Sequence, residues 1–141
     1  MRSALHRCVV ILSLLLAPLA LHGRVASEHI ALTPVNTGPP PEGCLAPLVR
    51  ASFYSTNFEG KEMANGGTFH EAVPTAASRT YPLGAVLDVT AQSTGKTVRL
   101  RVTDTGPWNH KFCLDLSTAA FKGLGLDEKR GWDWVSITRI R

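Results

Sequence analysis

Short runs of β-type residues, separated by turns rich in glycine and proline, most restrict what this chain can fold into. In residues 97–103 (TVRLRVT) every second residue is apolar. Such an alternation predicts a strand with one buried side and one solvent-facing side. The buried side is expected to hold Val98, Leu100 and Val102, and the solvent-facing side Arg99, Arg101 and Thr103.

Four further runs have the same character. The expected strands are 48–54, 85–91, 112–116 and 132–140, with Val135 and Ile137 of the last in the core. Residues 92–95 (QSTG) fit a hairpin loop, and residues 117–123 predict a short helix with Ser117 as its cap and Gly123 as its stop. Many short strands, frequent turns and one small helix favour an all-β fold, a small barrel.

The first 27 residues have the pattern of a secretory signal peptide. Arg2 and Arg7 precede an apolar run of 13 residues from Val9 to Leu21, and small residues follow at 25–27 (VAS). Such a run is too short for a membrane-spanning helix, which needs about 20 residues. We expect residues 1–27 to be removed on export to the periplasm, the cell envelope or the medium. The alternative is an N-terminal anchor that is not cleaved.

Residues 28–47 follow as a proline-rich segment. They hold five of the nine prolines in the chain and few large apolar residues. This composition predicts an extended linker. Residues 48–141 remain as a single domain, which is what a chain of 141 residues has room for.

The basic character of the chain lies mostly in the predicted signal peptide. The full chain has 15 Lys+Arg and 11 Asp+Glu, a net charge of +4. Residues 1–27 contain three arginines and no acidic residue, so the rest of the chain has a net charge of only +1. Without a concentrated basic face, nucleic acid is not an expected partner.

The cysteine count agrees with export. Cys8 lies in the predicted signal peptide, which leaves the pair Cys44 and Cys113. In an oxidising compartment these two are expected to form a disulfide, although two unpaired buried cysteines also fit the sequence. No cysteine directly follows the apolar run, so a lipoprotein is not expected.

Asp104 is a candidate catalytic residue because of its position in the chain. The chain has no nucleotide-binding motif, and its histidines and cysteines lack metal-ligand spacing, so we expect neither a cofactor nor a metal. Asp104 stands where a predicted strand ends and a Gly-Pro turn begins. Its carboxylate either points into a groove or accepts N–H groups of its own turn, as aspartate often does.

Small-residue and acidic motifs follow one another from Ala51 to Ser117. They are Ala51-Ser52-Phe53-Tyr54, Phe58-Glu59-Gly60, Ala64-Asn65-Gly66, Phe69, Thr75-Ala76-Ala77, Leu83-Gly84, Val98–Val102, Asp104, Gly106-Pro107 and Asp115-Leu116-Ser117. In order and spacing these motifs resemble the rare lipoprotein A (RlpA) family, whose double-psi β-barrel is related to the expansin and barwin barrels. The resemblance covers about two-thirds of the chain after the predicted signal peptide.

The resemblance implies a six-stranded double-psi β-barrel with one or two short helices. It also implies a lytic transglycosylase that cuts naked peptidoglycan strands at the MurNAc–GlcNAc β-1,4 bond and leaves a 1,6-anhydro end. The attacking group is the 6-hydroxyl of the sugar, so the enzyme needs fewer groups than the carboxylate pair of most glycosidases. Asp104 matches the family's aspartate, which implies that it acts as general acid and base.

Three polar positions of the family differ in this chain. The family has an acid after Ala-Asn-Gly, an aspartate after the next phenylalanine and a histidine after Thr-Ala-Ala. Gly67, His70 and Ser78 stand at these positions here, and Thr105 replaces the usual arginine after the aspartate. These changes leave open whether the chain cleaves its substrate.

If the chain is an enzyme, we expect His70 or Glu71 to assist Asp104. The two point to opposite sides of an extended segment, so only one of them can face the groove. Tyr54, Trp108 and Ser78 are then expected to contact the glycan.

The alternative is an expansin-like barrel that binds peptidoglycan or another polysaccharide without cutting it. Tyr54, Trp108, Trp132 and Trp134 are then the candidates for stacking on sugar rings. A third possibility is that the chain binds another protein of the cell wall. The expected partner is the glycan strand, with no membrane contact after signal cleavage. We expect a monomer without a C-terminal glycan-binding domain.

Overall fold

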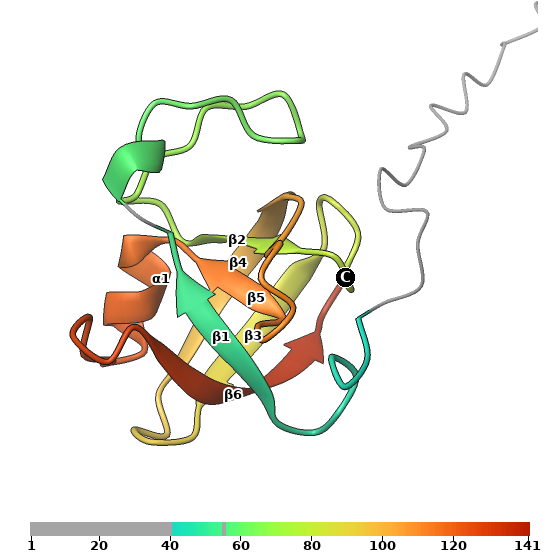
Figure 1. Cartoon of the computed structure of the whole chain (residues 1–141), viewed down its shortest axis with the longest axis vertical. Coiled ribbons are helices and arrows are strands. Elements are labelled where there is room, and N and C mark those ends of the chain that lie inside the picture. The colour runs from blue at the N-terminus through green and yellow to red at the C-terminus, as the bar shows by residue number, and fades with distance from the viewer. Residues whose placement is uncertain (1–40, 55) are drawn as a thin grey trace, which may run out of the picture. The chain divides into compact units, whose positions relative to one another are not determined.

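Six strands close into a barrel in the order β1-β5-β2-β4-β3-β6 (Figure 1). The computed structural model describes residues 41–54 and 56–141, so the predicted signal peptide and residues 28–40 of the predicted linker lie outside the described residues. The elements are β1 (Val49–Phe53), the 3-10 turn η1 (Thr56–Phe58), β2 (Thr75–Ser78), β3 (Val86–Ala91), β4 (Thr97–Asp104), β5 (Leu114–Leu116), α1 (Thr118–Gly123) and β6 (Trp132–Arg139). The prediction of a six-stranded all-β barrel is confirmed.

Two strand pairs in the barrel are parallel. They join β1 to β5 and β2 to β4, while the other neighbours are antiparallel. The hairpin expected at residues 92–95 does join β3 to β4, and Gly95 N–H donates to the carbonyl of Ala91 at 2.9 Å. Within the part of the chain that the structure describes, no helix is long and apolar enough to cross a membrane.

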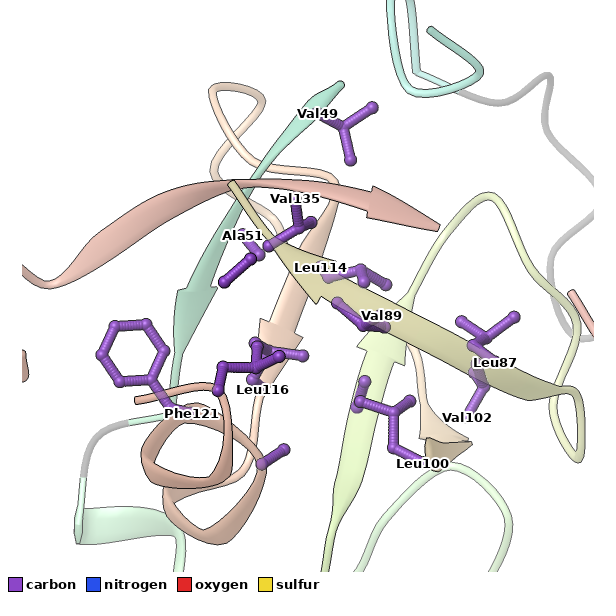
Figure 2. Packing of buried hydrophobic residues seen from close by; sticks show 14 of the residues in the cluster. Val49, Ala51, Leu87, Val89, Leu100, Val102, Leu114, Leu116, Phe121 and Val135 are labelled. Atoms are coloured by element: carbon purple, nitrogen blue, oxygen red, sulfur yellow. The ribbon is translucent and has the colours of Figure 1, made fainter. Parts of the chain in front are cut away.

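Alternate side chains of the strands fill the barrel. Leu87 and Val89 of β3, Val102 of β4, and Leu114 and Leu116 of β5 are fully buried together (Figure 2). Each such side chain contributes about 1.5–3 kcal/mol relative to exposure to water. The core therefore holds the strands rigidly, and the residues between these positions are left to form the outer surface.

Helix α1 packs against β2, β4 and β5, and its predicted bounds are confirmed. Ser117 is the N-cap, and its Oγ accepts the N–H of Ala120 at 3.2 Å. The helix ends at Gly123. A Cβ at this position would lie 2.8 Å from Cγ2 of Val98, so close packing against β4 explains the glycine.

A disulfide attaches the segment before β1 to the barrel. Cys44 is bonded to Cys113 across a sequence separation of 69, with their Cα atoms 5.4 Å apart. Closing a loop of this length stabilises the folded state by about 4 kcal/mol on the chain-entropy model. Residues 41–47, the described part of the predicted linker, are therefore tied to the folded domain.

Residues 56–74, which we call the lobe, connect β1 to β2 and lie beside the barrel (Figure 1). The lobe has a small core of its own, in which Met63 and Phe69 pack with Tyr54 and Ala77. Its Ala64–Gly67 turn is held against β4, because Asn65 N–H donates to the carbonyl of Thr103 at 3.2 Å. This contact brings the lobe to the end of the strand that carries Asp104.

Candidate active site

A pocket of about 280 Å³ opens between the end of β4, the end of β1 and β5. Its walls are Phe53, Tyr54, Phe58, Asp104, Thr105, Gly106, Pro107, Trp108 and Asp115. This volume lies just below the range of about 300–1,000 Å³ that is usual for small-molecule sites. The pocket combines aromatic walls with two carboxyl groups, and it brings together three of the predicted site residues: Asp104, Tyr54 and Trp108.

A β-bulge brings Asp104 into this pocket. β2 and β4 pair Ala76 with Val102 but Ala77 with Asp104, so Thr103 is an extra residue in β4. The prediction that Thr103 faces solvent is wrong: it is 6% exposed, because the bulge interrupts the alternation. Without the bulge, Thr103 would stand opposite Ala77, and Asp104 would point to the other side of the strand.

Three hydrogen bonds hold the Asp104 carboxylate. The Tyr54 hydroxyl donates to Oδ2 at 3.0 Å. The N–H groups of Ala64 and Thr105 donate to Oδ1 at 3.0 and 2.8 Å. Asp104 therefore does accept an N–H of its own turn, but the other two donors come from Tyr54, directly after β1, and from the lobe. The carboxylate is fixed where three separate segments meet.

Tyr54 positions Asp104 from the inner wall of the pocket. Its ring packs against Phe58 and Phe69 with centroid distances of 5.3 and 4.7 Å. Burial raises the pKa of the Tyr54 hydroxyl, and the nearby charges of Asp104 and Asp115 raise it further. The hydroxyl therefore stays protonated and serves as a permanent hydrogen-bond donor to Asp104.

Asp115 is the second carboxyl group of the pocket, and the residue-level reasoning did not select it as a site residue. Its Oδ1 accepts a hydrogen bond from the Ser52 hydroxyl on the neighbouring strand β1. Burial raises the pKa of Asp115, and the bond from Ser52 opposes this shift. A signal was available, because the alternation Leu114-Asp115-Leu116 in β5 turns the acid away from the core.

The two carboxyl groups stand on either side of Ala77. In the strand register Ala77 pairs with Asp115 on β5 and with Asp104 on β4. Two inter-strand spacings place the Cα atoms of the two aspartates about 10 Å apart. Both charges act on the Tyr54 hydroxyl and, together with its burial, raise its pKa.

Trp108 forms the outer rim of the pocket and is 73% exposed. Gly106, two residues before Trp108, has φ +126°, a conformation that favours glycine. A Cβ at Gly106 would lie 3.7 Å from the Ala77 side chain. The loop can therefore lie directly on β2 and present Trp108 to solvent beside Asp104. An exposed ring of this size beside a carboxyl pocket suits the apolar face of a sugar.

Comparison with known proteins places the chain in a family. The family model of lytic transglycolases matches residues 48–133. The chain belongs to this family. Its barrel is RlpA-like, as the sequence motifs predict.

Two curated relatives show how far the similarity extends. The endolytic peptidoglycan transglycosylase RlpA of Pseudomonas aeruginosa is 45% identical over 78 residues, which are 55% of this chain and 23% of that protein. The probable endolytic peptidoglycan transglycosylase RlpA of Synechocystis sp. is 38% identical over 76 residues, 54% of this chain and 24% of that protein. The chain thus spans about a quarter of the length of these relatives.

Solved structures of related barrels are also similar. An expansin of Clavibacter michiganensis, a mutant in complex with cellohexaose, aligns with a TM-score of 0.52 at 28% identity, over 67% of this chain and 50% of that one. Cerato-platanin 3 of M. perniciosa aligns with a TM-score of 0.51 at 15% identity, over 67% of this chain and 94% of that one. The second similarity shows the barrel fold alone.

The structure does not bring His70 to the pocket of this family member. His70 lies on the lobe, exposed, with its Nδ1 2.8 Å from Oε1 of Glu59. The other oxygen of Glu59 accepts the N–H of Glu71 at 2.7 Å. These two bonds lower the pKa of Glu59, the backbone bond most. Neither His70 nor Glu71 is among the residues that line the pocket.

Ser78 also lies away from the pocket lining. It ends β2 and is 1% exposed. Its Oγ accepts the N–H groups of Thr80 and Tyr81, each at 3.0 Å, and so holds the turn that follows. These bonds give Ser78 a structural task in the position where the family has histidine.

Gly67 stands in the lobe turn whose first residue, Ala64, donates to Asp104. Its position for a Cβ lies 3.2 Å from Oδ1 of Asn65 and 3.5 Å from Cε of Met63. The Asn65 side chain in turn accepts the Gly67 N–H at 2.9 Å. The turn that carries an acid in the family is thus present, and its acid is not.

The two tryptophans of β6 differ from each other. Trp132 is partly buried, with the guanidinium groups of Arg50 and Arg130 at 4.1 and 5.0 Å from its ring centroid. Trp134 is 40% exposed. Neither lines the pocket, and Asp133 between them is buried. Among the described residues, no group of His, Cys, Asp and Glu could hold a metal ion.

Proposed function

We propose that this barrel is a lytic transglycosylase that cleaves peptidoglycan glycan strands at the MurNAc–GlcNAc β-1,4 bond. The observation that carries the proposal is the presence of two carboxyl groups in one pocket in different environments. Asp104 is held by three hydrogen-bond donors, whereas burial raises the pKa of Asp115. Two titratable groups that differ in this way suit opposite roles in proton transfer. The curated relatives, which carry the name endolytic peptidoglycan transglycosylase, support the choice of reaction and substrate.

The sequence alone suggests Asp104 as both general acid and general base. With two carboxyl groups in the pocket, Asp115 can act as the acid and Asp104 as the base. Asp115 donates its proton to the glycosidic oxygen as the bond from that oxygen to C1 of MurNAc breaks. The 6-hydroxyl of the same MurNAc attacks C1 and passes its proton to Asp104. The products are a free 4-hydroxyl and a 1,6-anhydro end, and no water is consumed. The two carboxyl groups then exchange protons with solvent, which restores the starting state.

One aromatic residue would bind the strand, and another would keep the Asp104 carboxylate in position. Trp108 offers an exposed ring at the rim for one sugar face, and Tyr54 keeps Asp104 in place through its hydroxyl. Tyr54 contacts substrate only from the pocket wall, since its side chain is 9% exposed. Peptidoglycan lies outside the cytoplasm, so an exported protein with the Cys44–Cys113 disulfide fits this substrate.

One observation favours a second candidate, glycan binding without cleavage. Three family positions have lost their polar groups or directed them elsewhere: Gly67 has no acid, His70 pairs with Glu59, and Ser78 holds a turn. A pocket that kept its aromatic walls could then bind a strand as an expansin-like barrel does.

A digest of peptide-stripped glycan strands separates the two candidates. Mass spectrometry detects 1,6-anhydro ends, and a pelleting assay on insoluble glycan detects binding. We expect anhydro products from the wild type and about 10²–10⁴-fold less from Asp104→Asn, with both proteins pelleting. Binding without anhydro products from the wild type would support the second candidate, and absence of both would contradict both.

A further inference from the structure

Arg79 stands beside the rim of the pocket without a carboxylate partner. It follows β2 directly after Ser78, and its Cζ lies 6.0 Å from the ring centroid of Trp108. The ion pairs of the described residues join Glu59, Asp88, Glu128 and Asp133 to other cations. Among the described residues, the Arg79 charge thus has no carboxylate partner, and it lies beside the rim residue Trp108.

The environment of this guanidinium is incomplete. Its two terminal nitrogens lie 3.3 and 3.4 Å from Nδ1 of His110, so both are directed at a single ring nitrogen. Its Nε is buried and has no hydrogen-bond partner. A partly buried cation with unmet donors loses hydration that a carboxylate could replace through two parallel N–H···O bonds.

Arg50 has the same buried Nε without a hydrogen-bond partner, but aromatic rings cover its guanidinium group far more closely. Its Cζ lies 5.0 Å from the Phe112 ring centroid and 4.1 Å from that of Trp132, so rings cover it on two sides. Arg79 has one ring nearby at a longer distance, and that ring, Trp108, is 73% exposed. The difference leaves Arg79 open to a ligand that touches Trp108.

We propose that Arg79 binds the lactyl carboxylate of a MurNAc residue whose sugar ring contacts Trp108. This inference rests on the proposed function, because it takes a glycan strand as the ligand. On a strand without stem peptides each MurNAc carries a free lactyl carboxylate. On a peptide-bearing strand the same carboxyl is an amide and has no charge. Arg79 is therefore a specificity residue that favours naked strands, since its planar fork matches a carboxylate.

The test compares two ligands that differ only in this charge. The first is a peptide-free GlcNAc–MurNAc oligosaccharide with free lactyl carboxylates, and the second is the same oligosaccharide with those groups converted to carboxamides. Dissociation constants are measured by calorimetry with the otherwise intact mature protein carrying Asp104→Asn, which prevents turnover. We expect the free acid to bind about tenfold more tightly than the carboxamide.

Arg79→Gln should remove this preference by weakening binding of the free acid alone. Unchanged binding of the carboxamide by Arg79→Gln also shows that the variant is folded. The matched control is Arg99→Gln, which removes one positive charge at the Asp88 ion pair, five residues before Asp104 on β4 and about 17 Å from it along the strand. This control should keep the tenfold preference.

Four results would overturn the inference. A preference that persists in Arg79→Gln would assign the carboxylate to another group. Equal weakening for both oligosaccharides would mean that Arg79 supports the rim without reading the charge. If the protein that keeps Arg79 binds the free acid and the carboxamide equally well, the inference fails while the proposed function stands. If this protein binds neither oligosaccharide, the inference and the proposed function both fail.

Discussion

The pocket and the lobe each hold a carboxyl group with a hydrogen-bonding partner, in opposite environments. On the lobe, Glu59 is exposed, and the N–H of Glu71 and the ring of His70 lower its pKa. In the pocket, Asp115 is partly buried, and burial raises its pKa although Ser52 donates a hydrogen bond to it. Water solvates the ionised form of Glu59, whereas burial removes much of this solvation from Asp115. Only the second environment favours the protonated form that an acid catalyst needs.

The largest expected effect comes from Asp104→Asn. The change removes the base and leaves an amide oxygen that can still accept the N–H of Ala64 or Thr105. We expect cleavage to fall by about 10²–10⁴-fold, the usual contribution of a positioned general acid or base. The rate of anhydro-end formation measures it.

Asp88→Asn is the matched control for this variant. It removes a carboxylate from the exposed pair with Arg99 on β3 and β4, far from the pocket. Its rate should equal that of the wild type. Full activity in Asp104→Asn would contradict the mechanism.

Asp115→Asn should cost about 100-fold in activity and at the same time stabilise the protein at neutral pH. The pKa of Asp115 is raised above its ordinary value of 3.8, so the folded state binds this proton more tightly than the unfolded state does. The resulting stabilisation is present at low pH and is lost as the pH rises through the folded-state pKa. At pH 7 the ionised group is therefore unfavourable in the fold, and asparagine relieves this.

Thermal unfolding at two pH values measures the second effect. The Tm of Asp115→Asn should exceed that of the wild type by about 2–5 °C at pH 7, and the difference should shrink at pH 4. The same pKa makes wild-type cleavage decline as the pH rises. A variant less stable than wild type at pH 7 would show that the carboxylate is satisfied in the fold, against the assignment of Asp115 as the proton donor.

Much of the barrel could be predicted from the sequence, because its longer strands alternate cleanly. The runs at 85–91 and 97–103 became β3 and β4 nearly to the residue. β2 carried no such signal. All four of its residues, Thr75–Ser78, are buried on both sides of the sheet, so neither alternation nor bulk marks it. The motif resemblance supplied what periodicity could not.

The site was predictable in part, for a physical reason. Tyr54, Asp104 and Trp108 stand at strand ends and turns, where a polar or aromatic residue is easily noticed. The bulge at Thr103 and the pairing of both aspartates with Ala77 depend on contacts between segments far apart in sequence. For the same reason the sequence could not show that His70 faces Glu59 on the lobe.

Tyr54→Phe should have a smaller effect than either aspartate variant. The ring and its packing on Phe58 and Phe69 remain, and only the donor to Asp104 is lost. A hydrogen bond to a charged group is worth about 1.5–3 kcal/mol, or roughly 10- to 150-fold. Because the N–H donors of Ala64 and Thr105 still hold Asp104, we expect the lower end of this range, a fall in cleavage of about tenfold. The matched control is Tyr81→Phe, which removes a hydroxyl from a partly buried ring outside the pocket and should leave the rate unchanged.

The smallest effect is expected on the lobe, where His70→Ala and Glu59→Gln test whether its ion pair takes part in the reaction. Both side chains are exposed, 57% for His70 and 46% for Glu59, and solvent screens the interaction between them. Each variant, and the two combined, should cleave naked strands within about twofold of the wild-type rate. A loss comparable to that of Asp104→Asn would mean that the lobe closes onto the pocket when the strand binds. The Glu59–His70 pair would then become buried in the complex, as Asp115 already is in the free protein. A difference in burial would then no longer distinguish the lobe from the pocket.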